Sequence, residues 1–145
     1  MHTTRKVKVG LLGLTLDFYE KWPDIRKGRD AWVRQKVRPA LEPHADVIFH
    51  GAVFRRDAIE KEVSRLEAEG AEVLLVIALT YSTSLSSLTA LKNTALPIVV
   101  WNTQELFSVD ESYGSAELTA NHGVHGTFDL CNVLVRSKIR FGYIT

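Results

Sequence analysis

Two stretches of continuous apolar sequence place the strongest constraint on the fold of this chain. Glu72 to Leu79 reads EVLLVIAL, and Pro97 to Asn102 reads PIVVWN. Both have the length of a strand, and neither alternates apolar with polar residues as a strand with one solvent-facing side would. Strands covered on both faces are typical of parallel sheets with helices on either side. The two stretches therefore predict a buried parallel sheet.

Strand-length and helix-like segments alternate along the whole chain. We expect five strands, at Val7 to Thr15, Ala45 to Val53, Glu72 to Leu79, Pro97 to Asn102 and Ile139 to Ile144. We expect four helices, at Arg29 to Leu41, Arg56 to Glu69, Leu85 to Lys92 and Thr127 to Ser137, the first kinked or ended near Arg38 by Pro39. Right-handed crossovers between them predict a three-layer, doubly wound α/β fold. Its five-stranded parallel sheet has the flavodoxin-like order 2-1-3-4-5.

The composition predicts one domain, residues 1–145, because 46% hydrophobic content is enough for one packed core. The 18 Lys plus Arg nearly balance the 17 Asp plus Glu, so nucleic acid and anionic membranes are not expected partners. The lone Cys131 excludes an internal disulfide framework and fits a reducing compartment. No segment approaches the roughly 20 apolar residues that span a bilayer. We therefore expect a cytoplasmic protein.

The loops after the strands are the expected place for a binding site, because ligands of doubly wound sheets bind outside the carboxyl ends of the strands. Thr15 and Asp17 follow the first strand, the hydroxyl-rich stretch TYSTS at 80–84 follows the third, and Glu105 follows the fourth. Each also has a structural interpretation. TYSTS can cap a helix, Asp17 can be a solvated loop acid, and a role for Glu105 as general base has no further support in the sequence.

The stretch NHGVHG, Asn121 to Gly126, is the most unusual part of this edge. Its histidines, His122 and His125, are spaced i, i+3 at or just before a helix N-terminus, so their side chains can project the same way. Gly123 and Gly126 would let the backbone come close to a ligand. The pair could donate to a ligand oxygen, act as acid or base, or simply form a turn. Metal ligation by the pair alone is not expected, since no HExxH motif or Cys pair accompanies it.

Phosphate-site motifs of doubly wound folds do not occur in the sequence. GLLG within the first strand is not GxGxxG, and GxxxxGK[ST] is absent. The third strand ends in Leu79-Thr80 rather than in the aspartate of a phospho-acceptor receiver. Dinucleotide binding, P-loop chemistry and receiver signalling therefore have no support.

A resemblance to a known family rests on four segments: KVGLLGLTLDFYEKWPDIR, LLVIALTYSTS, PIVVWNTQ and, above all, NHGVHGTFDLCNVLVRSKIRFGYIT. Together they resemble the N-terminal domain of L-fucose and L-arabinose isomerase-like proteins. The resemblance spans nearly the whole chain, and its most specific part runs from Asn121 to Arg136.

The resemblance implies a flavodoxin-like domain of an enzyme that interconverts aldoses and ketoses with a divalent cation, commonly Mn²⁺. The acidic and histidine ligands of that cation belong to later domains. In the arabinose branch, the HG turn of the first domain reaches into the active site of a neighbouring subunit, which implies a homo-oligomer. His125 matches the substrate-contacting histidine, and His122 stands where arabinose isomerases carry glutamine. Thr15 and Asp17 would lie in a second loop that approaches the sugar, although their residue types differ from those of arabinose isomerases.

The length of the chain limits this interpretation, because the family continues into further domains beyond the position of Thr145. We therefore expect an N-terminal domain that is inactive alone, with no catalytic residue, metal or cofactor of its own and with the sugar and the later domains as partners. The alternative is a stand-alone flavodoxin-like module that binds a sugar or another protein. An independent enzyme that uses the histidine pair and Glu105 lacks a nucleophile and a complete metal site. The identity of the sugar depends on the later domains.

Overall fold

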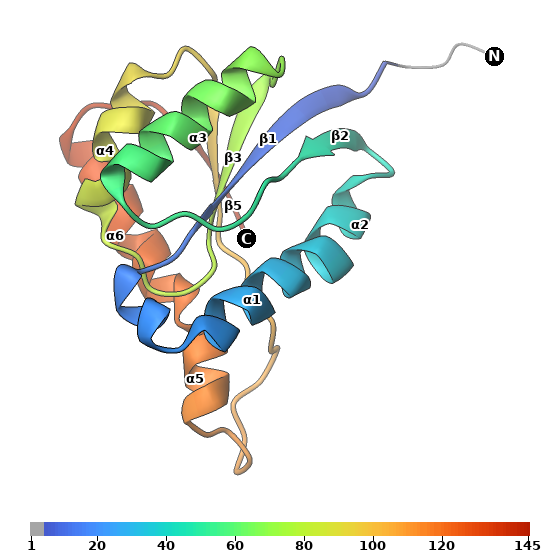
Figure 1. The fold of residues 1–145 in the computed structure, drawn as a ribbon, viewed down its shortest axis with the longest axis vertical. Coiled ribbons are helices and arrows are strands. Elements are labelled where there is room, and N and C mark those ends of the chain that lie inside the picture. The colour runs from blue at the N-terminus through green and yellow to red at the C-terminus, as the bar shows by residue number, and fades with distance from the viewer. Residues whose placement is uncertain (1–4) are drawn as a thin grey trace.

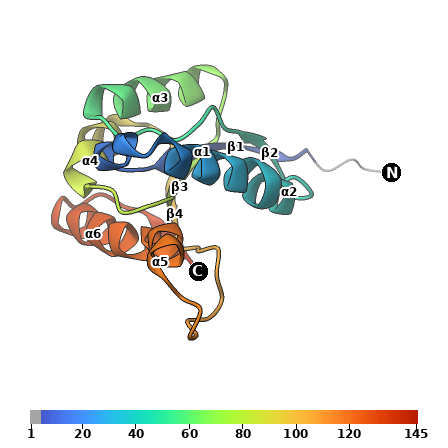
Figure 2. The ribbon, with the colours of Figure 1, turned by 60° about the horizontal axis from the view of Figure 1, so that its bottom comes forward.

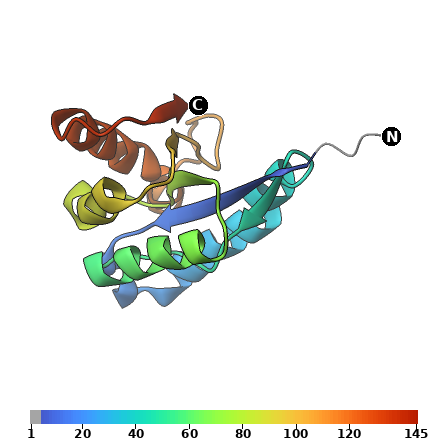
Figure 3. The ribbon, with the colours of Figure 1, turned by 90° about the horizontal axis from the view of Figure 1, so that it is seen from above.

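The centre of the domain is a five-stranded parallel sheet. The computed structural model describes residues 5–145. The strands are β1 (Val7–Leu14), β2 (Ala45–Ile48), β3 (Val73–Ala78), β4 (Ile98–Trp101) and β5 (Gly142–Ile144). They lie in the order β2-β1-β3-β4-β5, and every neighbouring pair is parallel. The predicted doubly wound α/β fold and its flavodoxin-like strand order are thereby confirmed. β2 and β5 form the two edges of the sheet (Figure 3).

Helices connect the successive strands. They are the short 3-10 helix η1 (Asp17–Lys21), α1 (Pro23–Trp32), the π-helical turn η2 (Val33–Val37), α2 (Arg38–Leu41), α3 (Arg56–Ala68), α4 (Ser84–Asn93), α5 (Ser115–Asn121) and α6 (Gly123–Arg136). Figure 1 shows α3 and the continuous helix α1–η2–α2 on opposite sides of β1. The domain therefore has the three layers that the sequence predicts.

Each face of the sheet has its own apolar core. Because successive strand residues point to opposite faces, Leu12 and Leu14 of β1 reach one core and Val9 and Leu11 reach the other. The helix residues of the first core come from α3, α4 and α6: Ile59, Val63, Leu66, Ala90, Leu91, Leu130 and Leu134. The second core receives Val33 and Val37 from the π-helical turn. Burial on both faces explains why the strand sequences are continuously apolar.

The first helix begins earlier than predicted but ends at Leu41, as predicted. It begins at Pro23 rather than Arg29, with the proline in the first turn, where its missing N–H is not needed. It also continues past Arg38. The turn Val33–Val37 is π-helical, and the N–H of Arg38 donates to the carbonyl of Val33. This wider turn directly precedes Pro39 and lets the chain accept a proline without ending the helix.

The end of the chain differs from the prediction in two elements. The helix expected from Thr127 begins four residues earlier, at Gly123, because packing compensates for the low helix propensity of glycine. The preceding helix α5 was not predicted, since its seven residues carry no clear apolar period. The carboxylate of Glu117 accepts a hydrogen bond of 2.9 Å from the N–H of Gly114 and stabilises its start.

All five strands are shorter than predicted, and the difference is largest for the edge strands β2 and β5. β2 ends at Ile48, and the following chain turns at Gly51, whose φ of 144° favours glycine. β5 covers only Gly142–Ile144, while Ile139 and Phe141, which were assigned to the strand, pack against the first core from irregular chain. These two apolar residues are thus partly buried without belonging to a strand.

Gly123 gives a direct test of how closely α6 packs against the sheet. A Cβ at this position would lie 2.0 Å from the carbonyl oxygen of Ala78. We expect Gly123→Ala to lower the free energy of unfolding by about 2 kcal/mol or more, because neither backbone can move aside freely. Gly28→Ala is the matched control, since no atom lies within 4 Å of its added Cβ. It should raise stability by about 0.5–1 kcal/mol. Urea unfolding measures both, and equal effects of the two substitutions would contradict this packing.

Candidate functional site

The two histidines of NHGVHG lie at the junction of α5 and α6. His122 is both the C-cap of α5 and the N-cap of α6, and His125 follows in the first turn of α6. Their ring centroids are 4.8 Å apart, with an interplanar angle of 74°. The expected helix N-terminus is therefore present, and the i, i+3 spacing does bring the two rings together.

Two tyrosines from other loops complete the group around His122. The hydroxyl of Tyr19, on η1, lies 3.4 Å from Nδ1 of His122. The ring of Tyr81, between β3 and α4, has its centroid 5.7 Å from that of His122. We call Tyr19, Tyr81, His122 and His125 the His–Tyr cluster. It joins three segments that lie far apart in the sequence and meet where β1 and β3 end.

The cluster is partly buried, and this burial shifts the pKa values of His122 and Tyr19. Burial lowers the pKa of His122, and the charge of His125 lowers it further. Burial raises the pKa of the Tyr19 hydroxyl. Both groups are therefore neutral at neutral pH. A neutral imidazole and a phenol each offer one donor and an acceptor, which suits the hydroxyl and carbonyl oxygens of an uncharged ligand.

Thr15 and Asp17, the other two predicted site residues, do not form the contact to His122. Thr15 is only 3% exposed, and its Oγ1 has no hydrogen-bond partner among the described residues. Its N–H donates to the carbonyl of Val53 over 3.0 Å. Asp17 is exposed on η1. From this loop it is Tyr19 that contacts His122. The only feature of the sequence that pointed to Tyr19 was its position in a loop after a strand.

Gly123 and Gly126 allow α6 to pack closely against the sheet. At Gly126 an added Cβ would lie 3.0 Å from the backbone nitrogen of Ser82, and at Gly123 it would meet Ala78. The first turn of α6 therefore rests directly on the end of β3 and the loop after it. This contact fixes where His122 and His125 stand relative to the sheet.

The TYSTS stretch starts α4, but its hydroxyls do not cap the helix. Thr83 occupies the N-cap without a side-chain cap bond, and its hydroxyl lies 2.8 Å from that of Ser86. Instead, Asp129 of α6 accepts a hydrogen bond of 3.2 Å from the N–H of Ser84. A carboxylate at this position also interacts favourably with the helix dipole. This bond joins α6 to α4 close to the cluster.

The segment 103–114, which we call the arm, joins β4 to α5 and is held at its base. The side chain of Arg29 is 12% exposed and pairs with Glu105 over 2.5 Å. Arg29 also donates to the carbonyl of Ala120 over 3.3 Å. Oδ1 of Asn121 accepts a hydrogen bond of 3.2 Å from the N–H of Leu106. Glu105 is thus engaged in an ion pair, which agrees with the structural interpretation of this residue.

Two hollows flank the cluster. One, of about 240 Å³, lies under the arm and is lined by His122, His125 and Asn121 together with arm residues. The other, of about 700 Å³, lies between η1–α1 and α5 and is lined by aromatic residues that include Tyr19. Only the larger one falls within the range of about 300–1,000 Å³ that is typical of small-molecule sites.

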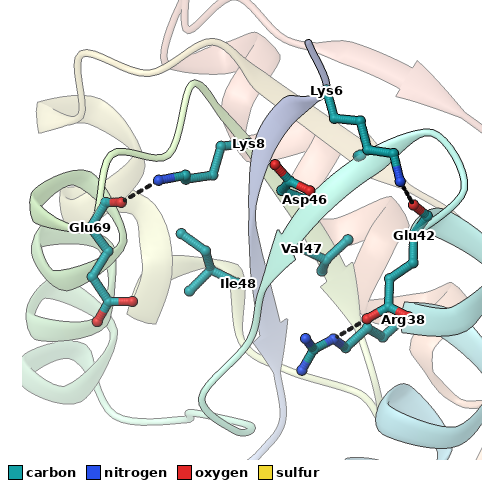
Figure 4. Close-up of a pocket in the computed structure, with 9 residues that line it drawn as sticks. Lys6, Lys8, Arg38, Glu42, Asp46, Val47, Ile48 and Glu69 are labelled. Atoms are coloured by element: carbon teal, nitrogen blue, oxygen red, sulfur yellow. Dashed lines mark hydrogen bonds and ion pairs between the residues drawn. The ribbon is translucent and has the colours of Figure 1, made fainter. Parts of the chain in front are cut away.

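A third hollow, of about 610 Å³, lies beside the β2 edge at the amino ends of the strands. Its three basic side chains are engaged in hydrogen bonds within the chain. Lys6 donates to the carbonyl of Glu42 over 2.5 Å, Arg38 pairs with the Glu42 carboxylate over 2.7 Å, and Lys8 donates to the carbonyl of Glu69 over 3.2 Å (Figure 4). Because ligands of such sheets bind at the carboxyl ends of the strands, the His–Tyr cluster is the stronger candidate site.

Among residues 5–145, no three His, Cys, Asp or Glu side chains lie close enough together to hold a metal ion. Within the same residues, no helix combines the length and the apolar character that crossing a bilayer requires.

Comparisons with known proteins identify no family for this chain. No protein-family model matches the chain, and no curated protein sequence matches it. Among solved structures, it is similar to the Lac repressor dimer bound to operator and the anti-inducer ONPF, with a TM-score of 0.41 and 11% identity. It is also similar to the Lac repressor bound to ONPG in the repressed state, with a TM-score of 0.40 and 13% identity. Each likeness covers 98% of this chain and 48% of the repressor chain, so the chain spans about half the length of these proteins. Similarity this low carries no argument about fold or function.

The protonation of His122 gives a test of the cluster. We expect its ring protons to titrate below about 6.5, the ordinary pKa of histidine, because burial and His125 both disfavour the charged form. Substituting His125→Asn should raise the pKa of His122 without restoring the ordinary value, since burial is the larger cause. Two-dimensional NMR titration measures both.

The sign of the linked effect on stability follows from the same shift. The unfolded chain binds a proton at His122 at higher pH than the folded chain does, so the stabilising contribution is complete above about pH 6.5 and is lost as pH falls through the lower folded pKa. A His122 resonance that titrates above the ordinary value would contradict the arrangement of the cluster.

Proposed function

We propose that this chain is the N-terminal, substrate-contacting and assembly domain of a metal-dependent aldose–ketose isomerase similar to L-fucose and L-arabinose isomerases. The observation that carries the proposal is the pairing of His122 and His125 at the carboxyl edge of the sheet, with Tyr19 on His122. Both histidines belong to NHGVHG, the most specific part of the resemblance. The activity of the whole enzyme, its sugar substrate and its oligomeric state are all part of this proposal.

The chemistry of the reaction explains why such side chains are useful. Aldose–ketose exchange moves a hydrogen between C1 and C2 of an open-chain sugar, whose remaining hydroxyls need hydrogen-bonding partners to hold the chain in one conformation. His125 is exposed and therefore accessible to a sugar oxygen. His122, held by Tyr19 and neutral at neutral pH, would accept from or donate to a second oxygen. In this proposal the domain positions the substrate and performs no transfer itself.

A divalent cation such as Mn²⁺ is expected in the complete enzyme, where it would polarise the carbonyl and hydroxyl oxygens of the sugar. The described residues of this domain do not fit such a cation. Mn²⁺ prefers several oxygen ligands, whereas the cluster offers two imidazoles, and no third ligand joins them among residues 5–145. The ligands would have to come from later domains, as the resemblance implies.

The alternative proposal is a stand-alone module that binds a sugar or a protein without catalysis. The same cluster supports it, because its uncharged donors and acceptors suit a polyol whether or not a reaction follows. Both proposals place the protein in the cytoplasm, a location that the lone Cys131 fits.

The decisive experiment uses the longest product of the parent gene, assayed with Mn²⁺ on a panel of aldoses that includes L-fucose and L-arabinose. Substituting His125→Ala in that product should lower kcat/KM about 10- to 100-fold, because a hydrogen bond that positions the substrate is lost. His44→Ala is the matched control, since His44 is exposed between α2 and β2, away from the strand ends that hold the cluster. Unchanged kcat/KM in the His125 variant would overturn the role of His125.

The intact mass of the same gene product separates the two proposals. A product about three or more times the length of one domain supports the isomerase. A product of one domain supports the binding module, and sugar titrations followed at His122 and His125 would then replace the isomerase assay.

A further inference from the structure

The hollow between η1–α1 and α5 is a concave apolar surface that the His–Tyr cluster does not use. Figures 1 and 2 show α5 near the beginning of α1, although the two helices are far apart in the sequence. Most of the lining is apolar or aromatic: Phe18, Tyr19, Trp22, Ile25, Ala116 and Ala120. Its volume of about 700 Å³ and this composition are both typical of small-molecule sites.

Three aromatic side chains on one short segment form a wall of the hollow. The ring centroid of Phe18 lies 5.2 Å from that of Trp22 and 5.8 Å from that of Tyr19, with interplanar angles of 60° and 76°. Phe18 is 50% exposed and Trp22 49%, so much of each ring meets water. The N–H of Trp22 donates to the carbonyl of Tyr19 over 2.9 Å, which fixes the turn that carries the rings. Because neighbouring rings are steeply inclined, a flat guest can stack on one ring and meet the edge of the next.

The charged residues in the lining, Asp24 and Arg29, do not favour a charged guest. The carboxylate of Asp24 is 95% exposed and lies 3.6 Å from Nζ of Lys27, so it stays hydrated at the rim. The side chain of Arg29 is 12% exposed and already binds Glu105 and the carbonyl of Ala120. A charged guest would lose hydration in the hollow without gaining a partner, whereas an uncharged guest would not.

The opposite wall, on α5, supplies hydroxyl groups. Ser115 and Thr119 both line the hollow. Oγ1 of Thr119 donates to the carbonyl of Ser115 over 2.8 Å, so the same oxygen can still accept a hydrogen bond. Aromatic rings that face a hydrogen-bond acceptor suit a guest whose ring carries a donor such as a hydroxyl group.

The apolar surface is bounded by charges on its η1–α1 side. Arg26 pairs with Glu20 over 2.7 Å, and Lys27 lies beside Asp24, so two ion pairs border the aromatic wall. Specific protein interfaces bury about 800 Å² of each partner around an apolar centre. A hollow with a charged border matches a small molecule better than a second protein surface.

We propose that this hollow is a binding site for an uncharged small molecule with an aromatic ring and a hydrogen-bond donor. The ring lies against Trp22 and the donor points to Thr119. Tyr19 lines the hollow, and its hydroxyl lies 3.4 Å from His122, so the site adjoins the His–Tyr cluster without using either histidine. The inference does not rest on the proposed isomerase function.

The first test titrates the chain with benzyl alcohol and follows amide and indole N–H signals by NMR. We expect saturable binding in the millimolar range, as for a ligand this small, with the largest shifts at Trp22, Gly28 and Thr119. Cyclohexylmethanol has the same number of carbon atoms and the same hydroxyl group but no flat ring. It should bind about 2- to 10-fold more weakly, because stacking is lost. Benzylamine and benzoate, which carry a charge on the same ring, should also bind more weakly.

The second test changes the hollow itself. Trp22→Ala removes the stacking surface and should weaken the binding of benzyl alcohol at least about fivefold. Gly28→Phe should abolish saturable binding, because its own ring occupies the hollow. Gly28 lines the hollow, and no atom lies within 4 Å of an added Cβ, so α1 accepts the side chain. Leu85→Ala is the matched control, since Leu85 is 61% exposed on α4, outside the hollow. Circular dichroism checks that each variant keeps the fold.

Three outcomes overturn the proposal. They are shifts that do not saturate or that centre outside the hollow, cyclohexylmethanol or a charged relative that binds as tightly as benzyl alcohol, and binding that Trp22→Ala and Gly28→Phe leave unchanged. The isomerase assay of the His125 variant concerns a residue outside the hollow, so failure of one proposal is distinguishable from failure of the other.

Discussion

The contact between the first turn of α6 and the end of β3 determines most of what is distinctive in this domain. It exists because Gly123 and Gly126 leave no side chain between the helix backbone and Ala78. Since the helix rests on the sheet at that point, His122 and His125 are placed over the strand ends, and Asp129, two turns into α6, reaches the start of α4. A site made of side chains from three loops is thereby held by the backbone of one helix. Rigid support of this kind is what a positioning site requires.

Arg29 links the segments that surround the cluster. Its guanidinium joins α1 to the arm through Glu105 and to α5 through the carbonyl of Ala120. Arginine suits this task because its planar group presents several donors in fixed directions. The cluster and the base of the arm are therefore supported by neighbouring contacts, whereas the arm's apolar residues remain exposed. The anchored base of the arm and its exposed apolar side chains thus lie close together in the sequence.

Much of the fold could be predicted from the sequence, because continuous apolar runs carry the information for a sheet buried on both faces. The runs of β3 and β4 predicted the parallel sheet, and the alternation of elements predicted the order of its strands. The site could be predicted only in part. His122 and His125 were recognised by spacing, but the contact of Tyr19 with His122 depends on the path of η1, which no periodicity records. Likewise, α5 is short, and the packing of Gly123 overrides its poor helix propensity, so local sequence alone could not place either helix boundary.

The last strand has a consequence for how the domain reaches and leaves its native state. β5 pairs only with β4, spans three residues and leaves Tyr143 and Ile144 each 46% exposed. The central strands β1 and β3, in contrast, are paired on both sides and buried. Because backbone groups with few buried contacts open at lower free energy than the global unfolding of a domain, we expect β5 to detach from the sheet before the central strands do. Amide hydrogens of β5 should therefore exchange with solvent through local fraying, and those of β1 and β3 only when the whole sheet opens.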